Sequence, residues 1–283
     1  MNILEIIDQI DKADPEFQDR IDPRRAAIKN MMGFGTKVAA AALPFAFTAL
    51  LKKAYGQTAT LTPAITTTLN IALRLEYFEA EFYNRGLAAS TLTIPSADRS
   101  NYIAPIAAHE NAHVNFLKGV LGSAALPAPA ANSYDFTAGG GFATVFSDYN
   151  TFLAVAQAFE DTGVRAYKGQ AGVLLGQQVF LTAALNIHSV EARHAAAIRY
   201  LRRTRGTAIK PWITGGNDTG IAAVNAVYDG EANVTQAGAD ISKLAGATAG
   251  TTISVNAATE SFDEPLTAAQ VTAIVSPFGV RFS

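Results

Sequence analysis

The sequence of 283 residues contains no cysteine and only four histidines. The absence of cysteine excludes disulfide bonds, thiolate zinc sites and cysteine nucleophiles. Charged residues make up only 16 % and hydrophobic residues 49 %, which excludes a disordered acidic or basic chain. The formal net charge of −2 does not indicate the excess of positive charge that nucleic-acid-binding proteins carry, so we do not expect nucleic acid as a partner. Any metal site must therefore consist mainly of carboxylates, and the positions of the four histidines become the first question.

Residues 1–56 have the pattern of an export signal. The pair Arg24 and Arg25 lies in a long polar segment, and a mainly apolar run follows over residues 31–51. This pattern, with small residues after the run, resembles a twin-arginine signal. The alternative is a retained N-terminal anchor, because about 20 apolar residues can span a bilayer. We therefore expect an exported protein, periplasmic or extracellular, that contacts a membrane only if this segment is retained.

Residues 57–205 contain four segments with helical periodicity. The segments span residues 63–87, 98–121, 147–174 and 177–203. Short connections join the first to the second and the third to the fourth, whereas the second and third are joined by 25 residues rich in Ala, Pro, Gly and Ser. Two antiparallel pairs with one long crossover form the pattern of a ferritin-like four-helix bundle, so the sequence predicts an all-α core of this architecture.

Several local features qualify this prediction. Pro105 predicts that the second helix starts late or bends there, and Ser147 is expected to cap the third helix with Asp148 in its first turn. Four arginines of the fourth segment are interpreted as a solvated face and as positive charge at the C-terminal end of the helix: Arg193, Arg199, Arg202 and Arg203. Residues 206–283 lose the periodicity and are expected to form an irregular extension packed on the bundle. Thr267 and Gln270 predict one short helix there, through a capping box.

Glutamates interrupt the apolar stripe of all four segments. The first and third segments each carry one glutamate followed seven residues later by a tyrosine. The second and fourth each carry a glutamate followed three residues later by a histidine, which places both on one face. These residues are Glu76, Tyr83, Glu110, His113, Glu160, Tyr167, Glu191 and His194. The two halves of the bundle therefore form an internal repeat.

Four carboxylates directed into one bundle core require a cation. Burying them unpaired is costly, and the same stripes offer no lysine or arginine to neutralise them. Two divalent metals would balance the four charges, with one imidazole completing each metal. One glutamate from each of two helices and a Glu-x-x-His pair from each of the other two form the ligand set of di-iron and di-manganese carboxylate bundles. Such mixed ligands favour iron or manganese over copper and structural zinc.

The stretches LNIALRLEYFEAEFY, HENAHVNFLKGVLG, AFEDTGVRAYKG and IHSVEARHAAAIRYLRR resemble the exported ferritin-like domain family. This family is related to bacterial ferritin-like proteins and to desiccation- or stress-related proteins, and the resemblance covers residues 61–205. It implies as metal ligands Glu76, Glu110, His113, Glu160, Glu191 and His194. Glu79 is the rival ligand in the first segment, and Glu76 is preferred because its spacing to Tyr83 recurs between Glu160 and Tyr167.

Residues 109–113 also form the HExxH motif of zinc metalloproteases. This alternative leaves His194 and the other glutamates unexplained, and the repeat has Val190 where the motif has His109. We expect His109 and His188 to flank the site, satisfied by hydrogen bonds.

The two repeat tyrosines, Tyr83 and Tyr167, have two interpretations. They are either core aromatics or catalytic residues that hydrogen-bond a ligand carboxylate or donate electrons.

The resemblance implies a centre of two iron ions, with two manganese ions as the alternative. Such a centre oxidises Fe(II) or consumes O₂ or H₂O₂, and a manganese pair would disproportionate H₂O₂. The second hypothesis is a stress-protective or structural protein in which the metals only hold the bundle together. The expected partners are metal ions and O₂ or H₂O₂. Homo-oligomer formation stays open, and nothing in the sequence specifies a cage.

Overall fold

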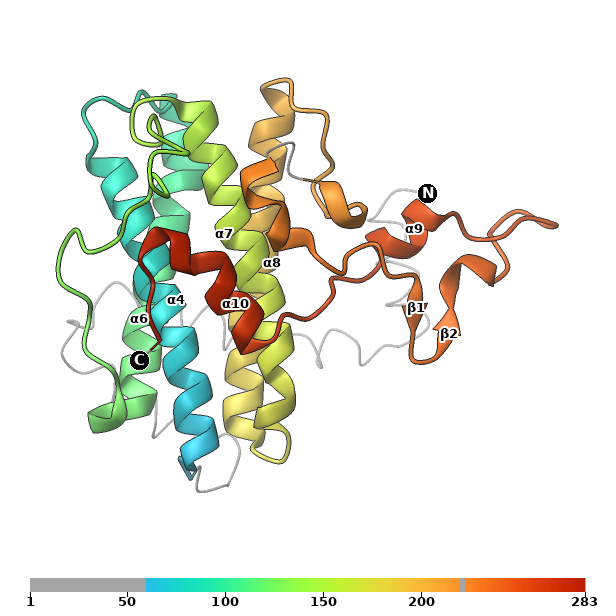
Figure 1. Ribbon diagram of the computed structural model, residues 1–283, viewed down its shortest axis with the longest axis horizontal. Helices are drawn as coiled ribbons and strands as arrows, with labels where there is room; N and C mark the ends of the chain where they lie inside the picture. Colours follow the sequence, from blue (N-terminus) through green and yellow to red (C-terminus); the bar gives the residue numbers. More distant parts are fainter. Residues whose placement is uncertain (1–59, 219–221, 283) are drawn as a thin grey trace, which may run out of the picture. The chain divides into compact units, whose positions relative to one another are not determined.

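The computed structural model describes residues 60–282, apart from residues 219–221. The predicted export signal or anchor therefore lies outside the described residues. Four long helices lie side by side (Figure 1): α4 (Pro63–Ala88), α6 (Ala104–Leu121), α7 (Tyr149–Gln170) and α8 (Gln178–Thr204). Helix α4 packs mainly on α6 and α7 on α8, and α4 also contacts α7. The predicted all-α four-helix bundle is confirmed. Among the described helices, none is long and apolar enough to cross a membrane.

Capping side chains mark the starts of α4 and α7. The hydroxyl of Thr62 accepts a hydrogen bond from the N–H of Ile65, and a proline follows Thr62 at the first helical position, where its missing N–H costs nothing. Helix α7 is capped by Asp148, which accepts from the N–H of Thr151 at 2.7 Å. The prediction of Ser147 as the cap was wrong, because a carboxylate interacts more favourably with the positive helix N-terminus.

The second helical segment has a wide turn before Pro105. It comprises α5 (Ser96–Asp98), a π-helical turn (Arg99–Ile103) and then α6. In the wide turn the N–H of Ala104 donates to the carbonyl of Arg99, five residues earlier. Because proline has no N–H to donate, a break in the regular α pattern at this point is expected, and the late start of α6 agrees with the sequence prediction.

The long crossover runs along α4. After a short 3₁₀ turn (Gly122–Ala124), its main chain exchanges hydrogen bonds with the Asn70 side chain, which donates to the carbonyl of Ala124 and accepts from the N–H of Leu126. Further along α4, Arg85 donates to the carbonyl of Tyr134. These contacts show how an irregular segment is held in place without secondary structure of its own.

The C-terminal extension contains short helices and one two-stranded hairpin, β1 (Thr235–Gln236) with β2 (Ala239–Asp240). Its helices are α9 (Val255–Glu260) and α10 (Ala268–Val275), and the predicted capping box of Thr267 and Gln270 at the start of α10 is confirmed. Helix α10 packs on α7. The chain approaches α7 so closely that a Cβ at Gly169 would lie 1.9 Å from the carbonyl oxygen of Leu266, so this position requires glycine.

Buried arginines join the extension to the bundle. Arg165 is fully buried, forms an ion pair of 2.7 Å with Glu231 and donates to the carbonyls of Val227, Asp229 and Glu264. A buried guanidinium with this many acceptors fixes the extension against α7, because buried donors and acceptors are stable only when they are paired.

A second buried arginine lies on α8. Arg199 is fully buried between Asp161 and Asp218, at 2.7 Å from each, and the hydroxyl of Tyr228 donates to Asp161. The interpretation of Arg199 and its neighbour Arg202 as a solvated face was therefore wrong: Arg202 is only 7 % exposed. Their partners come in part from the extension, whose sequence has no periodicity from which burial could be predicted.

Candidate metal centre

The six predicted ligands lie together inside the bundle. The structure forms two overlapping groups, and within each group one ligand atom per residue lies within 4.8 Å of the others. The first metal group is Glu76, Glu110, His113 and Glu191; the second metal group is Glu110, Glu160, Glu191 and His194. Every helix of the bundle contributes, and Glu110 and Glu191 belong to both groups. All six residues lie on the apolar stripes that face the interior of the bundle.

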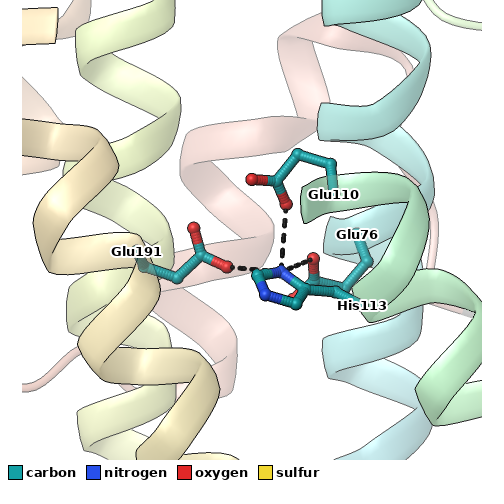
Figure 2. Close-up of side chains that lie close together, drawn as sticks. All are labelled: Glu76, Glu110, His113 and Glu191. Carbon is teal, nitrogen blue, oxygen red and sulfur yellow. Dashed lines mark hydrogen bonds and ion pairs between the residues drawn. The ribbon is translucent and has the colours of Figure 1, made fainter. Parts of the chain in front are cut away.

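The first metal group is centred on His113 of α6 (Figure 2). Its Nδ1 atom lies 3.1 Å from an oxygen of Glu76, 3.3 Å from Oε2 of Glu110 and 3.1 Å from Oε1 of Glu191. The three glutamates are fully buried and His113 is 8 % exposed. One nitrogen and three carboxylate oxygens therefore converge from three helices.

The second metal group repeats this geometry around His194 of α8. Its Nδ1 atom lies 2.8 Å from Oε1 of Glu110, 3.4 Å from Oε2 of Glu160 and 3.3 Å from Oε2 of Glu191. Glu110 and Glu191 thus each direct one carboxylate oxygen toward His113 and the other toward His194. Two carboxylates placed in this way can bridge two cations.

Unpartnered buried atoms test whether metal ions fit this centre. Within the described part of the chain, ten buried side-chain atoms make no hydrogen bond, and five of them belong here, where they have only the ion-pair distances given above. They are Oε1 of Glu110, Oε2 of Glu160, both carboxylate oxygens of Glu191 and Nδ1 of His194. Leaving such atoms without partners is costly, and carboxylate oxygens with imidazole nitrogens are ligands that iron and manganese prefer. The residues present therefore fit two metal ions.

In the metal-free protein, protons take the place of the cations. Burial and the charge of Glu191 raise the pKa of Glu110, and burial raises the pKa of Glu160 to about 7. Although burial alone would lower it, the surrounding carboxylates raise the pKa of His194 to about 12. Burial opposes ionisation of Glu191 too, but the two adjacent imidazoles lower its pKa to about 2. Protonated histidines thus supply positive charge among the carboxylates.

Tyr83 and Tyr167 hydrogen-bond the glutamates of the opposite repeat. The hydroxyl of Tyr83 on α4 donates to Glu160 on α7 at 2.5 Å, and the hydroxyl of Tyr167 on α7 donates to Glu76 on α4. Burial and the adjacent glutamates raise both tyrosine pKa values well above 10, which keeps the hydroxyls as donors. The two interpretations from the sequence thus coincide: both are core aromatics, and both contact a predicted ligand.

His109 and His188 lie outside both groups. Nδ1 of His109 lies 2.9 Å from Nε2 of His194, and the two rings are parallel within 9°. His188 contacts the carbonyl of Val164 through its Nδ1 at 3.0 Å. Because His109 is exposed and contacts the far nitrogen of His194, it does not converge with His113 on one ion as HExxH requires. This geometry counts against the metalloprotease alternative.

Glu79, the rival ligand, is buried beside the centre but belongs to neither group. It faces Gly163 of α7, where an added Cβ would lie 3.3 Å from Oε1 of Glu79. Gly163 is the repeat equivalent of Glu79. Because Gly163 has no side chain, the carboxylate of Glu79 has room beside it. Burial and the charges of Glu191 and Glu110 raise the pKa of Glu79 well above its ordinary value.

Residues 64–204 match the family model of the ferritin-like domain. This stretch contains all four bundle helices and every member of both metal groups, and the chain belongs to the ferritin-like domain family. Comparisons with curated proteins and with solved structures gave no match. The family, the fold and the buried glutamate–histidine cluster agree on a site that could bind metal.

Proposed function

We propose that this protein holds a pair of iron ions, with manganese as the alternative, and oxidises Fe(II) or consumes O₂ or H₂O₂. The observation that carries the proposal is the placement of Glu110 and Glu191, which direct one oxygen each toward His113 and His194. Two redox-active ions held this close together can jointly supply two electrons to one oxidant, whereas stabilising the fold needs no such pairing.

A pair of redox-active ions supplies electrons to the oxidant when bound. The chain contributes the geometry: Glu110 and Glu191 hold the two positions together, and Glu76 and Glu160 close each group from the opposite side. Tyr83 and Tyr167 hold these two outer carboxylates in orientation by donating to one oxygen of each. The fully buried glutamates are shielded from bulk water, which strengthens every electrostatic contact in the centre.

We also propose that the protein works outside the cytoplasm, in the periplasm or the cell envelope. The export pattern of residues 1–56 supports this location. A twin-arginine route carries folded proteins, so the metal centre could be assembled before export.

The second candidate is a stress-protective protein in which the metals stabilise the fold without turnover. The five unpartnered buried atoms favour it, because a bound cation would satisfy them and raise the stability of the bundle.

Metal loading followed by oxidant separates the two candidates. Protein loaded anaerobically with Fe(II) is mixed with O₂ or with H₂O₂, while oxidant uptake and the near-ultraviolet absorption of ferric iron are recorded. Repeated turnover supports the oxidase, and loading with Mn(II) followed by O₂ release from H₂O₂ supports the manganese alternative. A metal-loaded protein that is stabilised but consumes no oxidant contradicts the enzyme and supports the stabilising role.

A further inference from the structure

The two halves of the bundle are filled differently around their tyrosines. Glu76 corresponds to Glu160 and Tyr83 to Tyr167, an offset of 84 residues in both pairs. The same offset pairs the other residues of α4 and α7, so the surroundings of Tyr83 and Tyr167 can be compared position by position.

Around Tyr83 the space is filled by aromatic rings. Phe82 and Phe152 stack with centroids 4.7 Å apart and planes within 7°, and Phe159 lies 5.0 Å from Phe82. Phe152 packs so closely on Gly86 that a Cβ there would lie 2.4 Å from its ring. Tyr83 is consequently fully buried in a continuous aromatic cluster.

Around Tyr167 the equivalent rings are missing. Phe82 is replaced by Ala166, Phe152 by Thr68 and Phe159 by Leu75. These three residues line a pocket with a cavity volume of about 20 Å³, which is partly open to solvent and whose wall includes Tyr167. The loss of three aromatic side chains at equivalent positions explains the cavity, because close-packed interiors leave such space only where side-chain volume is removed.

A second pocket adjoins the first and also has Tyr167 in its wall. It is enclosed by α6 and α8 residues such as Phe116 and Ile187, and it shares Leu69, Tyr167 and Ala184 with the first pocket. The Tyr167 ring therefore stands between apolar space and its hydrogen-bond partner Glu76, a member of the first metal group.

The geometry points to this pair of pockets as a binding site and access route for dioxygen. The inference rests on the proposed function and deepens it by assigning the oxidant and the side from which it arrives. Nearly all of the lining is apolar, so a hydrated ion or H₂O₂ would lose its hydrogen bonds to water without replacement. A small apolar molecule loses none, and dry apolar cavities are known to take up such molecules.

Xenon, a small apolar atom, tests the binding site without any metal. We expect ¹²⁹Xe NMR of the full-length, metal-free protein to show a saturable site that disappears in Ala166→Phe, which restores the ring found at Phe82. Leu185→Phe is the matched control, because Leu185 is 45 % exposed on α8 and lines neither pocket. Leu75→Phe restores a second ring and serves if Ala166→Phe does not fold.

Oxidation of the Fe(II)-loaded protein tests the route. We expect Ala166→Phe to slow the reaction with O₂ about ten-fold or more, with unchanged iron content and an unchanged rate with H₂O₂. Absence of xenon from the parent, or an O₂ rate that stays the same after the xenon site is lost, overturns the route. An Fe(II)-loaded parent that reacts with neither oxidant overturns the proposed function itself, which the xenon measurement does not address.

Discussion

Tyr83 and Glu160 lie in different repeats of the bundle and share a hydrogen bond of 2.5 Å, in which the phenol donates to the buried carboxylate. Tyr167 and Glu76 form the reciprocal contact. Each helix that contributes one glutamate and no histidine to the metal groups thus supplies the tyrosine that orients the ligand glutamate of the other. This exchange couples α4 and α7 at the centre of the bundle, where aromatic side chains of the two helices also pack together.

We expect Tyr83→Phe to weaken metal binding at the second metal group. The change leaves the ring in place and removes only the donor to Glu160, and loss of such a partner typically costs about 10–100-fold in metal affinity. Isothermal titration with Fe(II) or Mn(II) measures the effect. Tyr200→Phe, at a residue 48 % exposed, is the control. Equal affinities in Tyr83→Phe and the parent would contradict a role for this hydrogen bond.

The shared glutamates predict a difference in metal stoichiometry. Glu110 belongs to both metal groups and Glu76 to only one. We therefore expect Glu110→Ala to lose both metals and Glu76→Ala to lose chiefly one, whereas the double variant Glu76→Ala, Glu160→Ala should retain neither. Metal content per folded chain after gel filtration decides this. Identical stoichiometry in Glu110→Ala and Glu76→Ala would refute the bridging assignment.

The contact between His109 and His194 predicts a selective effect on one metal position. His109 contacts Nε2 of His194, which fixes the ring and leaves Nδ1 of His194 to bind a metal. His113 has no such neighbour, because the repeat has Val190 at the position equivalent to His109. We expect His109→Ala to weaken one of two binding steps about ten-fold. His188→Ala is the control, since His188 contacts only the carbonyl of Val164 among the interactions described. A uniform loss at both steps would contradict the account.

Metal binding should release protons. Because the pKa of His194 is about 12 without metal, its imidazole is protonated at neutral pH, and a metal must displace that proton. Apparent affinity therefore rises with pH. Titrations in two buffers of different ionisation enthalpy should reveal release of on the order of two protons per centre. Binding heats that do not depend on the buffer would be the contrary result.

The same raised pKa affects the stability of the metal-free protein. Protonated His194 stabilises the fold fully below its ordinary pKa of 6.5, and this contribution is lost as the pH rises toward 12.

The buried ion pair of Arg165 and Glu231 predicts that the extension contributes to stability. Arg165→Met leaves the buried Glu231 without its cation, with only the N–H of Glu264 still donating to it, and breaking such a pair costs about 3–5 kcal/mol. Urea unfolding at pH 8 measures this free energy. Arg193→Met, at an exposed position of α8, is the control. Coincident unfolding curves for Arg165→Met and the parent would show that the extension is not held in this way.

Much of the bundle could be predicted because its helices carry strong periodicity. The first segment was expected over residues 63–87 and is found as Pro63–Ala88. The predicted ligands stood out because glutamate and histidine contradict an apolar stripe at repeat-related positions. Glu76 and Glu79 lie on nearly the same face of α4, and only the repeated spacing to a tyrosine favoured Glu76; in the structure Glu76 belongs to a metal group and Glu79 does not.

The remaining features depend on contacts between distant segments. The burial of Arg199 follows from Asp218 and Tyr228, which no local pattern connects to α8. The contact of His109 with His194 joins α6 to α8 in the same way. The pocket beside Tyr167, by contrast, is partly indicated by the sequence. Comparing the repeats at the 84-residue offset shows that Ala166 replaces Phe82, but only the structure shows that a pocket remains there.

Elemental analysis of the folded protein purified from its native host tests the central claim most directly. The account predicts two iron ions, or two manganese ions, per chain, and their loss in the variant Glu110→Ala. A protein that contains no metal, a single zinc ion, or the same two metals in Glu110→Ala would contradict it.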